Sequence, residues 1–388
     1  MPHLPLGTLR RGAGVTEVPG VRLGHHTRDT DGALTGVTVI VPPPGTMAAV
    51  DVRGGGPAGH ETGVIEPGTH PYGADAIVLT GGSAHGLVTT HGVMEGLMAD
   101  GRGFPAPGAA GAAGVTVPIV PAAALFDLGR GTAPFAPPLA AHGLAAYRAA
   151  AEAPSPAPGN VSGHALGHAS GLRGSLGAGT GAWTGRGLTR GGLGQAALTT
   201  PTGHTVAAVV AVNAMGSLLD PTGRFHAGTV LAQYGYAPGD APGISGRWEE
   251  LDRAAEETAR REDQGASGAG ADGARNTTIA CLVTDAALDS AQTQRLAASA
   301  HAGLARAVHP SHTLYDGDTV FALSTQASPI APGDLPEVLV GLNIAAADVL
   351  TAAMVDAVFS ATPSGVPGAP PALGELAPEA AAAWAALP

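Results

Sequence analysis

Short apolar runs that end at glycine or proline recur along the chain, and they predict buried strands. A run of roughly four to eight apolar residues bounded by turn residues is typical of a strand with both faces covered. Residues 15–24 predict a short strand and turn at the start. The other predicted strands cover residues 36–41 (GVTVIV), 47–53, 74–80 (ADAIVLT), 205–212 (TVAAVVAV), 279–283 and 319–323.

Longer apolar stretches with helical periodicity lie between these strands. Because strands come early and late with helices between them, we expect a mixed α/β sandwich rather than a repeat protein or a helical bundle. Residues 238–276 read as a linker, and the Pro/Ala-rich residues 363–388 as a mobile tail or a docked extension. The predicted helices cover residues 87–98, 139–151, 288–308 and 338–359, with a short charged helix at 248–263.

The most unusual stretch is residues 264–284, where a polar, glycine- and alanine-rich segment turns into an apolar strand. Asn276 and Thr277 stand at the change. One interpretation is a long loop that enters a strand, and the junction by itself favours it. The other is self-cleavage, in which the Thr277 hydroxyl attacks the preceding carbonyl. The new N-terminal residue then carries a nucleophile and an α-amine that titrates at about pH 8 and can act as a base.

Composition narrows the possible classes of function. The 388 residues carry a net charge of −12, with 60 glycines, 33 prolines, 4 % aromatic and 44 % hydrophobic residues. This mixture suits tight turns and small-residue packing in one or two domains rather than disorder. The acidic balance argues against a nucleic-acid partner. The single cysteine, Cys281, excludes an intramolecular disulfide.

The chain also shows no sign of export or membrane insertion. Residues 1–24 lack an apolar signal core, and no apolar run is long enough to predict a membrane span. We therefore expect a cytoplasmic protein.

Residues 176–194 are exceptionally rich in glycine, and Gly177, Gly179 and Gly181 match a dinucleotide-binding pattern. No clean strand precedes the pattern, and no acidic residue lies near position 200 to hold a ribose. We therefore expect no cofactor here. A loop that brings backbone N–H groups close to a substrate or an intermediate is the favoured interpretation.

Residues 81–86 (GGSAHG) stand between a predicted strand and a predicted helix, which is the context of a nucleophile elbow. His85 takes the place of the last glycine in the G-x-S-x-G pattern, so a tight turn is the simpler interpretation. A serine hydrolase that uses Ser83 stays open as an alternative.

Other polar residues allow both a structural and a catalytic interpretation. Asp316 and Asp318 flank a glycine, as in a plain turn or in a carboxylate pair that supports proton transfer. Asn213 ends a predicted strand, either as a cap or as an amide donor to an oxyanion. The 15 histidines lack the spacing of metal ligands, so we expect no metal site. Cys281 reads as an inert core residue because its neighbours are apolar.

Together these stretches resemble one family, the self-processing hydrolases that include the L-aminopeptidase/D-amidase-esterases, the β-aminopeptidases and the nylon-oligomer endo-hydrolases. The resemblance runs in order along nearly the whole chain and ends at residue 362. It rests on residues 18–27 (VPGVRLGHHT), 35–45 (TGVTVIVPPPG), 50–62 (VDVRGGGPAGHET), 76–87 (AIVLTGGSAHGL), 177–182, 191–194, 209–216 (VVAVNAMG), 276–286 (NTTIACLVTDA) and 315–325 (YDGDTVFALST).

The resemblance implies an α/β/β/α sandwich, in which two sheets pack face to face between helical layers. It also implies autocleavage between Asn276 and Thr277. The products would be an α chain (1–276) and a β chain (277–388), which stay together as one composite domain.

The resemblance further implies roles for individual residues. Thr277 would be the N-terminal nucleophile, with its own amine as base, and Asn213 would lie in the oxyanion site. Asp316 and Asp318 match acidic residues beside the nucleophile in the nylon-oligomer branch. The implied substrates are small peptides or ω-amino-acid oligomers, whose amides are hydrolysed through an acyl-enzyme without a cofactor. The implied assembly is a homo-oligomer, such as a tetramer of αβ units.

Two positions depart from the nylon-oligomer branch. Arg186 stands where that branch has a lysine, and Phe126 where it has a tyrosine. Arg186 can stabilise an anion but cannot act as a neutral base, and Phe126 has no hydroxyl to donate. An aminopeptidase/D-esterase that acts on N-terminal residues is the alternative within the family. A non-catalytic relative with the same fold is the alternative among proteins that are not enzymes.

Overall fold

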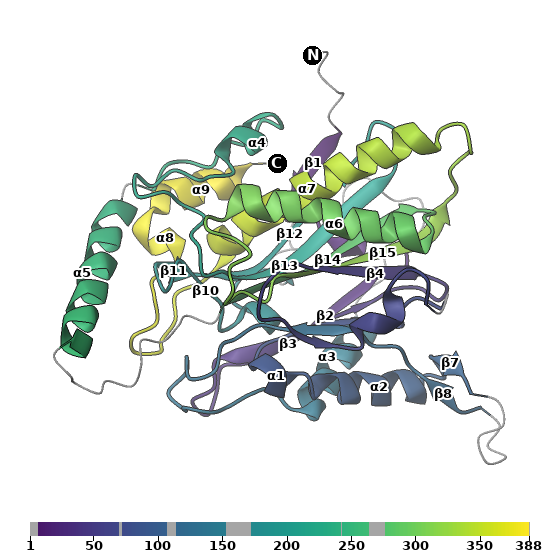
Figure 1. Cartoon of the computed structure of the whole chain (residues 1–388), viewed down its shortest axis with the longest axis horizontal. Coiled ribbons are helices and arrows are strands. Elements are labelled where there is room, and N and C mark those ends of the chain that lie inside the picture. The colour runs from purple at the N-terminus through teal and green to yellow at the C-terminus, as the bar shows by residue number, and fades with distance from the viewer. Residues whose placement is uncertain are drawn as a thin grey trace.

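Two β-sheets pack face to face in the centre of the molecule, and helices cover their outer faces (Figure 1). The layers confirm the predicted α/β/β/α sandwich. The computed structural model describes residues 7–69, 72–106, 114–152, 172–241, 243–263 and 276–387. The polar approach to the junction, residues 264–275, lies outside the described residues.

The larger sheet has six strands, and the junction lies at its centre. Neighbouring strands run antiparallel, except that β14 and β15 are parallel. In spatial order the strands are β1 (Thr8–Arg11), β12 (Gly192–Thr199), β13 (Thr205–Asn213), β14 (Thr277–Ala286), β15 (Thr319–Ser328) and β4 (Met47–Val52).

The smaller sheet has five strands and mixes both directions, since β6 and β9 are parallel. In spatial order its strands are β2 (Arg22–Arg28), β3 (Thr35–Val41), β6 (Ile77–Thr80), β9 (Ala122–Ala124) and β5 (Ala58–His60).

Two pairs of helices form the outer layers. α6 (Ser290–Ala307) and α7 (Leu335–Ser360) cover the larger sheet, and α2 (Thr89–Ala99) and α3 (Ala140–Glu152) cover the smaller one (Figure 1). The remaining elements are η1 (Val15–Glu17), η2 (Thr62–Ile65), α1 (Ser83–Gly86), β7 (Phe104–Pro105), β8 (Thr116–Val117), η4 (Gly177–Gly179), β10 (Trp183–Thr184), β11 (Thr189–Arg190), α4 (Gly228–Ala232), α5 (Ile244–Asp263), α8 (Leu373–Leu376) and α9 (Pro378–Ala386).

The alternation of side chains along β14 separates two apolar cores. Ile279, Cys281 and Val283 belong to the core between the sheets, whereas Ala280 and Leu282 belong to the core under α6 and α7. Successive side chains of a strand point to opposite faces, so a strand covered on both sides must be apolar at every position. This is why the sequence shows a continuous apolar run here. Cys281 is buried as predicted, and burial raises the pKa of its thiol.

Among the described residues, α7 is long and apolar enough to cross a membrane by length and composition. In this protein, however, 72 % of its most apolar window is buried. It packs against β12 and β13 of the larger sheet and against α6. The helix therefore serves as the core helix of one outer layer.

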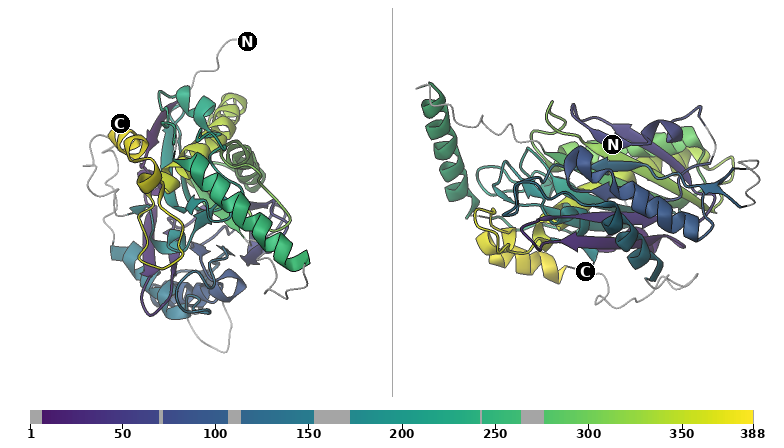
Figure 2. Two further views of the ribbon diagram at one scale, coloured as in Figure 1. Left: turned by 90° about the vertical axis from the view of Figure 1, so that its left-hand side faces the viewer. Right: turned by 90° about the horizontal axis from the view of Figure 1, so that it is seen from below.

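The C-terminal residues dock on the body of the protein. Trp384 of α9 is 3 % exposed, and its ring stacks on Phe359 at 5.0 Å between centroids. Arg11 donates a hydrogen bond of 2.6 Å to the carbonyl of Ala385. Of the two interpretations of the tail, the structure shows the docked extension. Seen from two further directions, α5 lies at the same end of the sandwich as α8 and α9 (Figure 2).

The largest difference from the predicted elements is the glycine-rich segment at 176–194. Besides the short turn η4, it forms the hairpin β10–β11 and the start of β12. Its glycines allow close packing: a Cβ on Gly192 would stand 2.6 Å from the carbonyl oxygen of Ala357 in α7. At the N-terminus, residues 15–24 form η1 and a turn, and β2 begins only at Arg22.

Gly194 of β12 offers a test of this close approach. A Cβ there would stand 2.0 Å from the carbonyl oxygen of Ala353 in α7. We expect Gly194→Ala to lower the free energy of unfolding by about 2–3 kcal/mol, because helix and strand must move apart. Urea denaturation measures this.

Gly246→Ala in α5 is the matched control, because a Cβ at Gly246 meets no atom within 4 Å. We expect it to leave stability unchanged or to raise it by up to about 1 kcal/mol. Equal effects of the two substitutions would contradict the packing argument.

Candidate active site

Thr277 is the first residue of β14, and the strands on either side bring the other predicted residues to it. In the pairing of β13 with β14, Asn213 stands opposite Thr277. On the other side, Asn276 forms a parallel bridge with Asp316, just before β15. All four residues are buried. The sheet thus gathers residues that are distant in sequence into one polar cluster inside an apolar core.

The Thr277 hydroxyl is held between two backbone groups. Its Oγ1 donates a hydrogen bond of 2.5 Å to the carbonyl oxygen of Asn276, the residue that precedes it. It accepts one of 3.1 Å from the backbone N–H of Gly317. A Cβ on Gly317 would stand only 2.9 Å from this oxygen. The glycine between the two aspartates therefore lets the backbone approach the hydroxyl.

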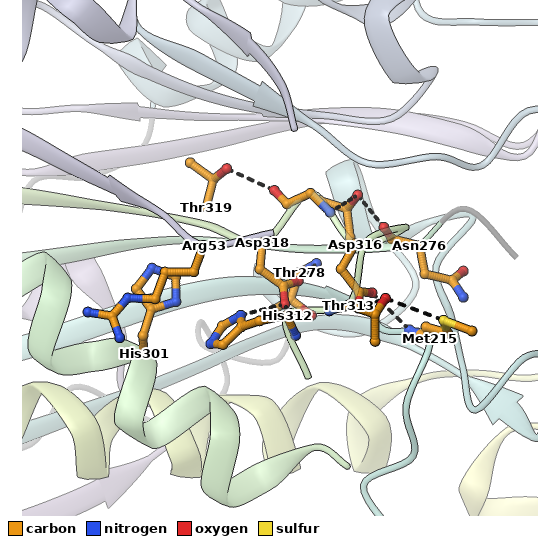
Figure 3. A network of polar contacts seen from close by, with 12 residues as sticks. Arg53, Met215, Asn276, Thr278, His301, His312, Thr313, Asp316, Asp318 and Thr319 are labelled. Atoms are coloured by element: carbon orange, nitrogen blue, oxygen red, sulfur yellow. Dashed lines mark hydrogen bonds and ion pairs between the residues drawn. The ribbon is translucent and has the colours of Figure 1, made fainter. Parts of the chain in front are cut away.

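Asp318 accepts hydrogen bonds from three N–H donors (Figure 3). The backbone N–H of Thr278 donates to its Oδ1 at 2.8 Å. His312 donates to Oδ2 twice, from its backbone N–H at 3.1 Å and from Nδ1 at 2.9 Å. Three donors that converge on one buried carboxylate fix its orientation beside Thr277.

Asp316 lies beside Asp318 and is fixed by different donors. Thr313 donates to its Oδ2 from the backbone N–H at 2.9 Å and from the hydroxyl at 2.6 Å. Met215 donates to Oδ1 from its backbone N–H at 3.3 Å. Burial, and secondly the charge of Asp318, raise the pKa of Asp316, and the hydrogen bonds oppose this shift. The structure therefore brings together the two carboxylates that sequence reasoning singled out.

A groove of about 1110 Å³ opens behind Asp318, between α6 and α7. His312 lines it, as does His301, whose ring lies 4.9 Å from that of His312 and whose pKa burial lowers to about 4. Three arginines, Arg53, Arg295 and Arg306, also line it, and Arg306 pairs there with Asp348 at 2.9 Å. His312 and Arg53 connect the groove to the cluster, since both also hydrogen-bond to Asp318.

Among the described residues, Arg130 contacts the junction with its guanidinium, and the sequence alone did not point to it. Its Nη2 donates to Oδ1 of Asn276 at 3.0 Å, and its Nη1 donates to Oδ1 of Asn213. Nη1 also donates to the carbonyl of Gly181 at 2.7 Å, and the guanidinium lies 4.6 Å from the centroid of the Trp183 ring. In the sequence, Arg130 stands between Gly129 and Gly131 after an apolar segment, and this pattern only weakly indicates a functional residue.

Asn213 is fully buried and held at both ends of its amide. Its Oδ1 accepts from Arg130 and from the backbone N–H of Trp183 at 3.1 Å. Its Nδ2 donates to the backbone carbonyl of Phe126 at 3.1 Å. Phe126 thus reaches the site through its backbone. One N–H of the Asn213 amide is committed to this contact, which leaves the other as a potential donor.

Asp127 is a buried carboxyl between the turn at Gly82 and Arg130. The backbone N–H of Gly82 donates to its Oδ1 at 2.7 Å. Burial raises the pKa of Asp127 to about 6, against hydrogen bonds from Thr35 and Gly82 and the charge of Arg130. No sequence pattern pointed to this residue.

The glycine loop and Arg186 lie differently from what the sequence predicted. The N–H of Gly177 donates to Thr27 Oγ1 at 3.0 Å, and that of Gly179 to the carbonyl of Leu176 at 2.9 Å. These two N–H groups serve internal contacts rather than facing a substrate, and Gly181 enters the site through its carbonyl. Arg186 is exposed at the tip of the β10–β11 hairpin, with a positive φ of 55°. The guanidinium within the cluster belongs to Arg130, because the hairpin tip points to solvent.

Ser83 does follow a strand and open a helix, with a positive φ of 53°. Its backbone N–H donates to the carbonyl of Leu125 at 2.8 Å. In the described part of the chain, no hydrogen bond joins its hydroxyl to a histidine or a carboxylate, and His85 packs on the ring of Phe135. Nor do the described residues include a group of three side chains that could hold a metal ion.

Solved structures share this fold, and one of them is described as a new variant of the Ntn hydrolase fold. A β-aminopeptidase from Burkholderia sp. is 23 % identical, with a TM-score of 0.60 over 100 % of this chain and 98 % of that one. An L-aminopeptidase D-Ala-esterase/amidase from Ochrobactrum anthropi, described as such a variant, is 20 % identical, with a TM-score of 0.60 over 95 % and 91 %.

The family follows from the sequence itself. The model of peptidase family S58 matches residues 13–369, and the chain belongs to this family. An uncharacterized aminopeptidase of Mycobacterium tuberculosis is 36 % identical over 370 residues, which cover 91 % of this chain and 96 % of the relative. A NylC-analogous protein of Agromyces sp. is 37 % identical over 62 residues, 16 % of this chain and 20 % of that one. The protein is therefore an amide hydrolase of the peptidase class.

Asp318 tests the structural part of the cluster. Asparagine keeps one acceptor oxygen, but its NH2 group replaces the other oxygen and faces the N–H donors that Asp318 accepts from. At least one buried N–H group therefore loses its acceptor. We expect Asp318→Asn to lower the free energy of unfolding by about 1–3 kcal/mol. Asp334→Asn, at an exposed position before α7, is the control, and we expect it to change little. Equal stability of the two variants in urea would argue against the contacts drawn in Figure 3.

Asp127 predicts a pH dependence. Its folded pKa of about 6 lies above the ordinary value of 3.8, so the folded state holds its proton more tightly than the unfolded state. The stabilisation that the protonated carboxyl of Asp127 gives to the folded state is therefore fully present below pH 4 and is lost as the pH rises through 6. As the pH rises from 4 to 7, we expect the free energy of unfolding of Asp127→Asn to increase by about 3 kcal/mol relative to that of the wild type. A difference in unfolding free energy that stays constant with pH would refute this.

Proposed function

We propose that this peptidase cleaves its own chain between Asn276 and Thr277, and then uses Thr277 as an N-terminal nucleophile on amide substrates. The observation that carries the proposal is the short contact between the Thr277 hydroxyl and the Asn276 carbonyl inside a buried polar cluster. A plain loop entering a strand needs no such cluster. Thr277 is also only 5 % exposed in the uncut chain, so a substrate gains access only once the site has opened.

The first stage forms an ester from a peptide bond. Thr277 Oγ1 attacks the carbonyl carbon of Asn276, and its proton moves to the departing nitrogen, which is the Thr277 nitrogen itself. The C–N bond breaks, and an ester joins Asn276 to the Thr277 side chain. Water then hydrolyses the ester, which leaves a carboxylate on Asn276 and a free amine and hydroxyl on Thr277.

The second stage repeats this chemistry on a substrate. Thr277 Oγ1 attacks the substrate amide carbon, the α-amine takes the hydroxyl proton, and the leaving amine departs protonated. Water attacks the acyl-enzyme and restores the hydroxyl. The α-amine arises where the chain bridges to Asp316, and Asp318 holds the next backbone N–H. These carboxylates stabilise the ammonium form that the amine adopts after taking the proton.

The developing oxyanion needs donors that are already oriented. The second N–H of Asn213 and the guanidinium of Arg130 are the candidates, since both side chains already meet at the junction. Loss of one such donor raises the barrier by about 3 kcal/mol in comparable sites. Arg186 contributes from the hairpin tip only if that hairpin moves.

The fold supports a cleaved enzyme that stays in one piece. β14 lies between β13 and β15, so its backbone is hydrogen-bonded on both sides after the chain breaks at its first residue. The α and β chains would therefore remain a single domain. Assembly into a homo-oligomer and a cytoplasmic location remain predictions.

The substrate class that we favour is small peptides with a free N-terminus. The relatives at 36 % identity over most of the chain carry the name aminopeptidase. A second candidate is an ω-amino-acid oligomer, which the short similarity to a NylC-analogous protein and the acidic pair at Asp316 and Asp318 favour.

Intact-mass spectrometry under denaturing conditions tests the proposal first. We expect two fragments that break before Thr277 in the wild type and a single uncut chain in Thr277→Ala. Loss of the nucleophile should lower amide hydrolysis on the order of 10⁴-fold. Thr277→Ser should still cleave itself, because it keeps the hydroxyl. Thr222→Ala, in an exposed turn, is the control and should be cut as the wild type is.

The rival nucleophile gives a different result. If Ser83 carries the reaction, Ser83→Ala is inactive and the wild-type chain stays uncut. If Thr277 carries it, Ser83→Ala is cut and active. Cleavage and full activity in Thr277→Ala would rule out the proposed mechanism.

A further inference from the structure

The side chain of Asn276 is buried among fixed partners beside the bond that we propose is cut, and we call the space that it fills the Asn276 pocket. Asn276 is 3 % exposed, and its Oδ1 accepts from Arg130 Nη2 at 3.0 Å. Arg130 is held in turn by the carbonyl of Gly181, by Asn213 and by the ring of Trp183. None of these four contacts with Arg130 belongs to the acidic pair. The pocket therefore has its own fixed cation.

The chemistry of the two stages links this pocket to the substrate. In the ester formed during self-cleavage, Asn276 is the acyl group on Thr277 Oγ1. In the acyl-enzyme formed later, the substrate's acyl residue occupies the same bond to the same oxygen. The side chain next to the acyl carbon therefore points into the same space in both intermediates. During self-cleavage, Asn276 therefore occupies the position that the acyl residue of a substrate takes later.

We propose that the space filled by the Asn276 side chain is the acyl-side specificity pocket of the mature enzyme, and that Arg130 selects acyl residues with a side-chain carboxylate or carboxamide. Aspartyl and asparaginyl amides are the substrates of this chemistry. The inference rests on the proposed function of Thr277.

A carboxylate fits this pocket better than the carboxamide that fills it in the precursor. The Nδ2 of Asn276 is buried and meets no acceptor among the described residues. A carboxylate presents two oxygens to the guanidinium and leaves no donor without a partner, and such charge-assisted pairs are the stronger ones. We therefore expect aspartyl amides to be preferred to asparaginyl amides.

The same pocket disfavours other acyl residues. A leucyl side chain offers no acceptor to Nη2 of the half-buried Arg130, whose Nη1 keeps its bonds to Asn213 and Gly181, so the hydrogen bond that favours Asn276 is not formed. A lysyl side chain would add a second cation beside it. Asp127 lies near enough to weaken the charge of Arg130 but is bonded to Gly82, outside the contacts of Asn276.

The first experiment uses the processed wild-type enzyme and four amino-acid p-nitroanilides: aspartate linked through its α-carboxyl, asparagine, leucine and lysine. We expect kcat/KM to fall in that order, with aspartate at least about 10-fold above leucine and leucine above lysine. A leucyl or lysyl substrate that is cleaved as well as the aspartyl one overturns the proposal.

The second experiment asks the same question within the chain. Asn276→Asp should be cut at least as fast as the wild type, Asn276→Leu about 10-fold more slowly, and Asn276→Lys most slowly, as followed by mass spectrometry over time. Thermal unfolding shows that each variant is folded. Agreement between this order and the order of the four substrates supports one shared pocket. Equal rates for leucine and asparagine at position 276 overturn it.

Arg130→Gln addresses the guanidinium itself, and Arg295→Gln on the exposed face of α6 is the control. In a processed Arg130→Gln enzyme, we expect the ratio of aspartyl to leucyl kcat/KM to fall to about 1, chiefly through KM of the aspartyl substrate. An Arg130→Gln chain that folds but stays uncut, while Arg295→Gln is cut, supports the contact with Asn276. A preserved aspartyl preference contradicts the role of Arg130.

The outcomes separate the two proposals. A wild-type chain that stays whole and inactive removes the proposed function of Thr277. A chain that is cut and active but prefers leucyl or lysyl amides removes only the role of Arg130.

Discussion

The pairing of β14 with a strand on each side is the constraint on which the rest of the site depends. β13 fixes Asn213 opposite Thr277, and the loop before β15 places Asp316 beside Asn276. β13 pairs with β14 without interruption, and the pairing of β14 with β15 is regular from Ile279 to Thr284, in the middle of a six-stranded sheet. A slip by one residue would move Thr277 to the other face of the sheet. The position of the hydroxyl is therefore as rigid as the core itself.

A second constraint is the free-energy cost of burying polar groups away from water. The cluster at the head of β14 buries two carboxylates and two carboxamides, and a guanidinium reaches it. Each group has at least one partner, although Nδ2 of Asn276 meets no acceptor among the described residues. The signs of charge are separated, because the aspartates lie on the β15 side and Arg130 lies on the β13 side with Asn213. Thr277 stands between them. The peptide bond held there has carboxylate acceptors on the side of its nitrogen and the donors Arg130 and Asn213 on the side of its carbonyl. The proposed chemistry requires this arrangement.

Glycine makes these approaches possible at a few positions. Gly317 lets the backbone N–H reach the Thr277 oxygen, and Gly194 lets α7 lie against β12. Small residues also bring the layers together, so the larger sheet is supported tightly from both faces. A chain with few aromatic residues can therefore still enclose a buried polar cluster.

The sequence alone determined many of the buried strands and helices, because a strand covered on both faces must be apolar at every position, as in residues 279–283, but it did not show the strands of the glycine-rich segment 176–194. It also pointed to Thr277, Asn213, Asp316 and Asp318, since each stands where an apolar run begins or ends. Only the tertiary structure showed Arg130 at the junction and Arg186 at an exposed hairpin tip. An arginine in a glycine-flanked loop has no periodicity, and its partners lie 83 and 146 residues away in the chain. Local patterns encode burial, whereas contacts between distant side chains depend on how the sheets pack.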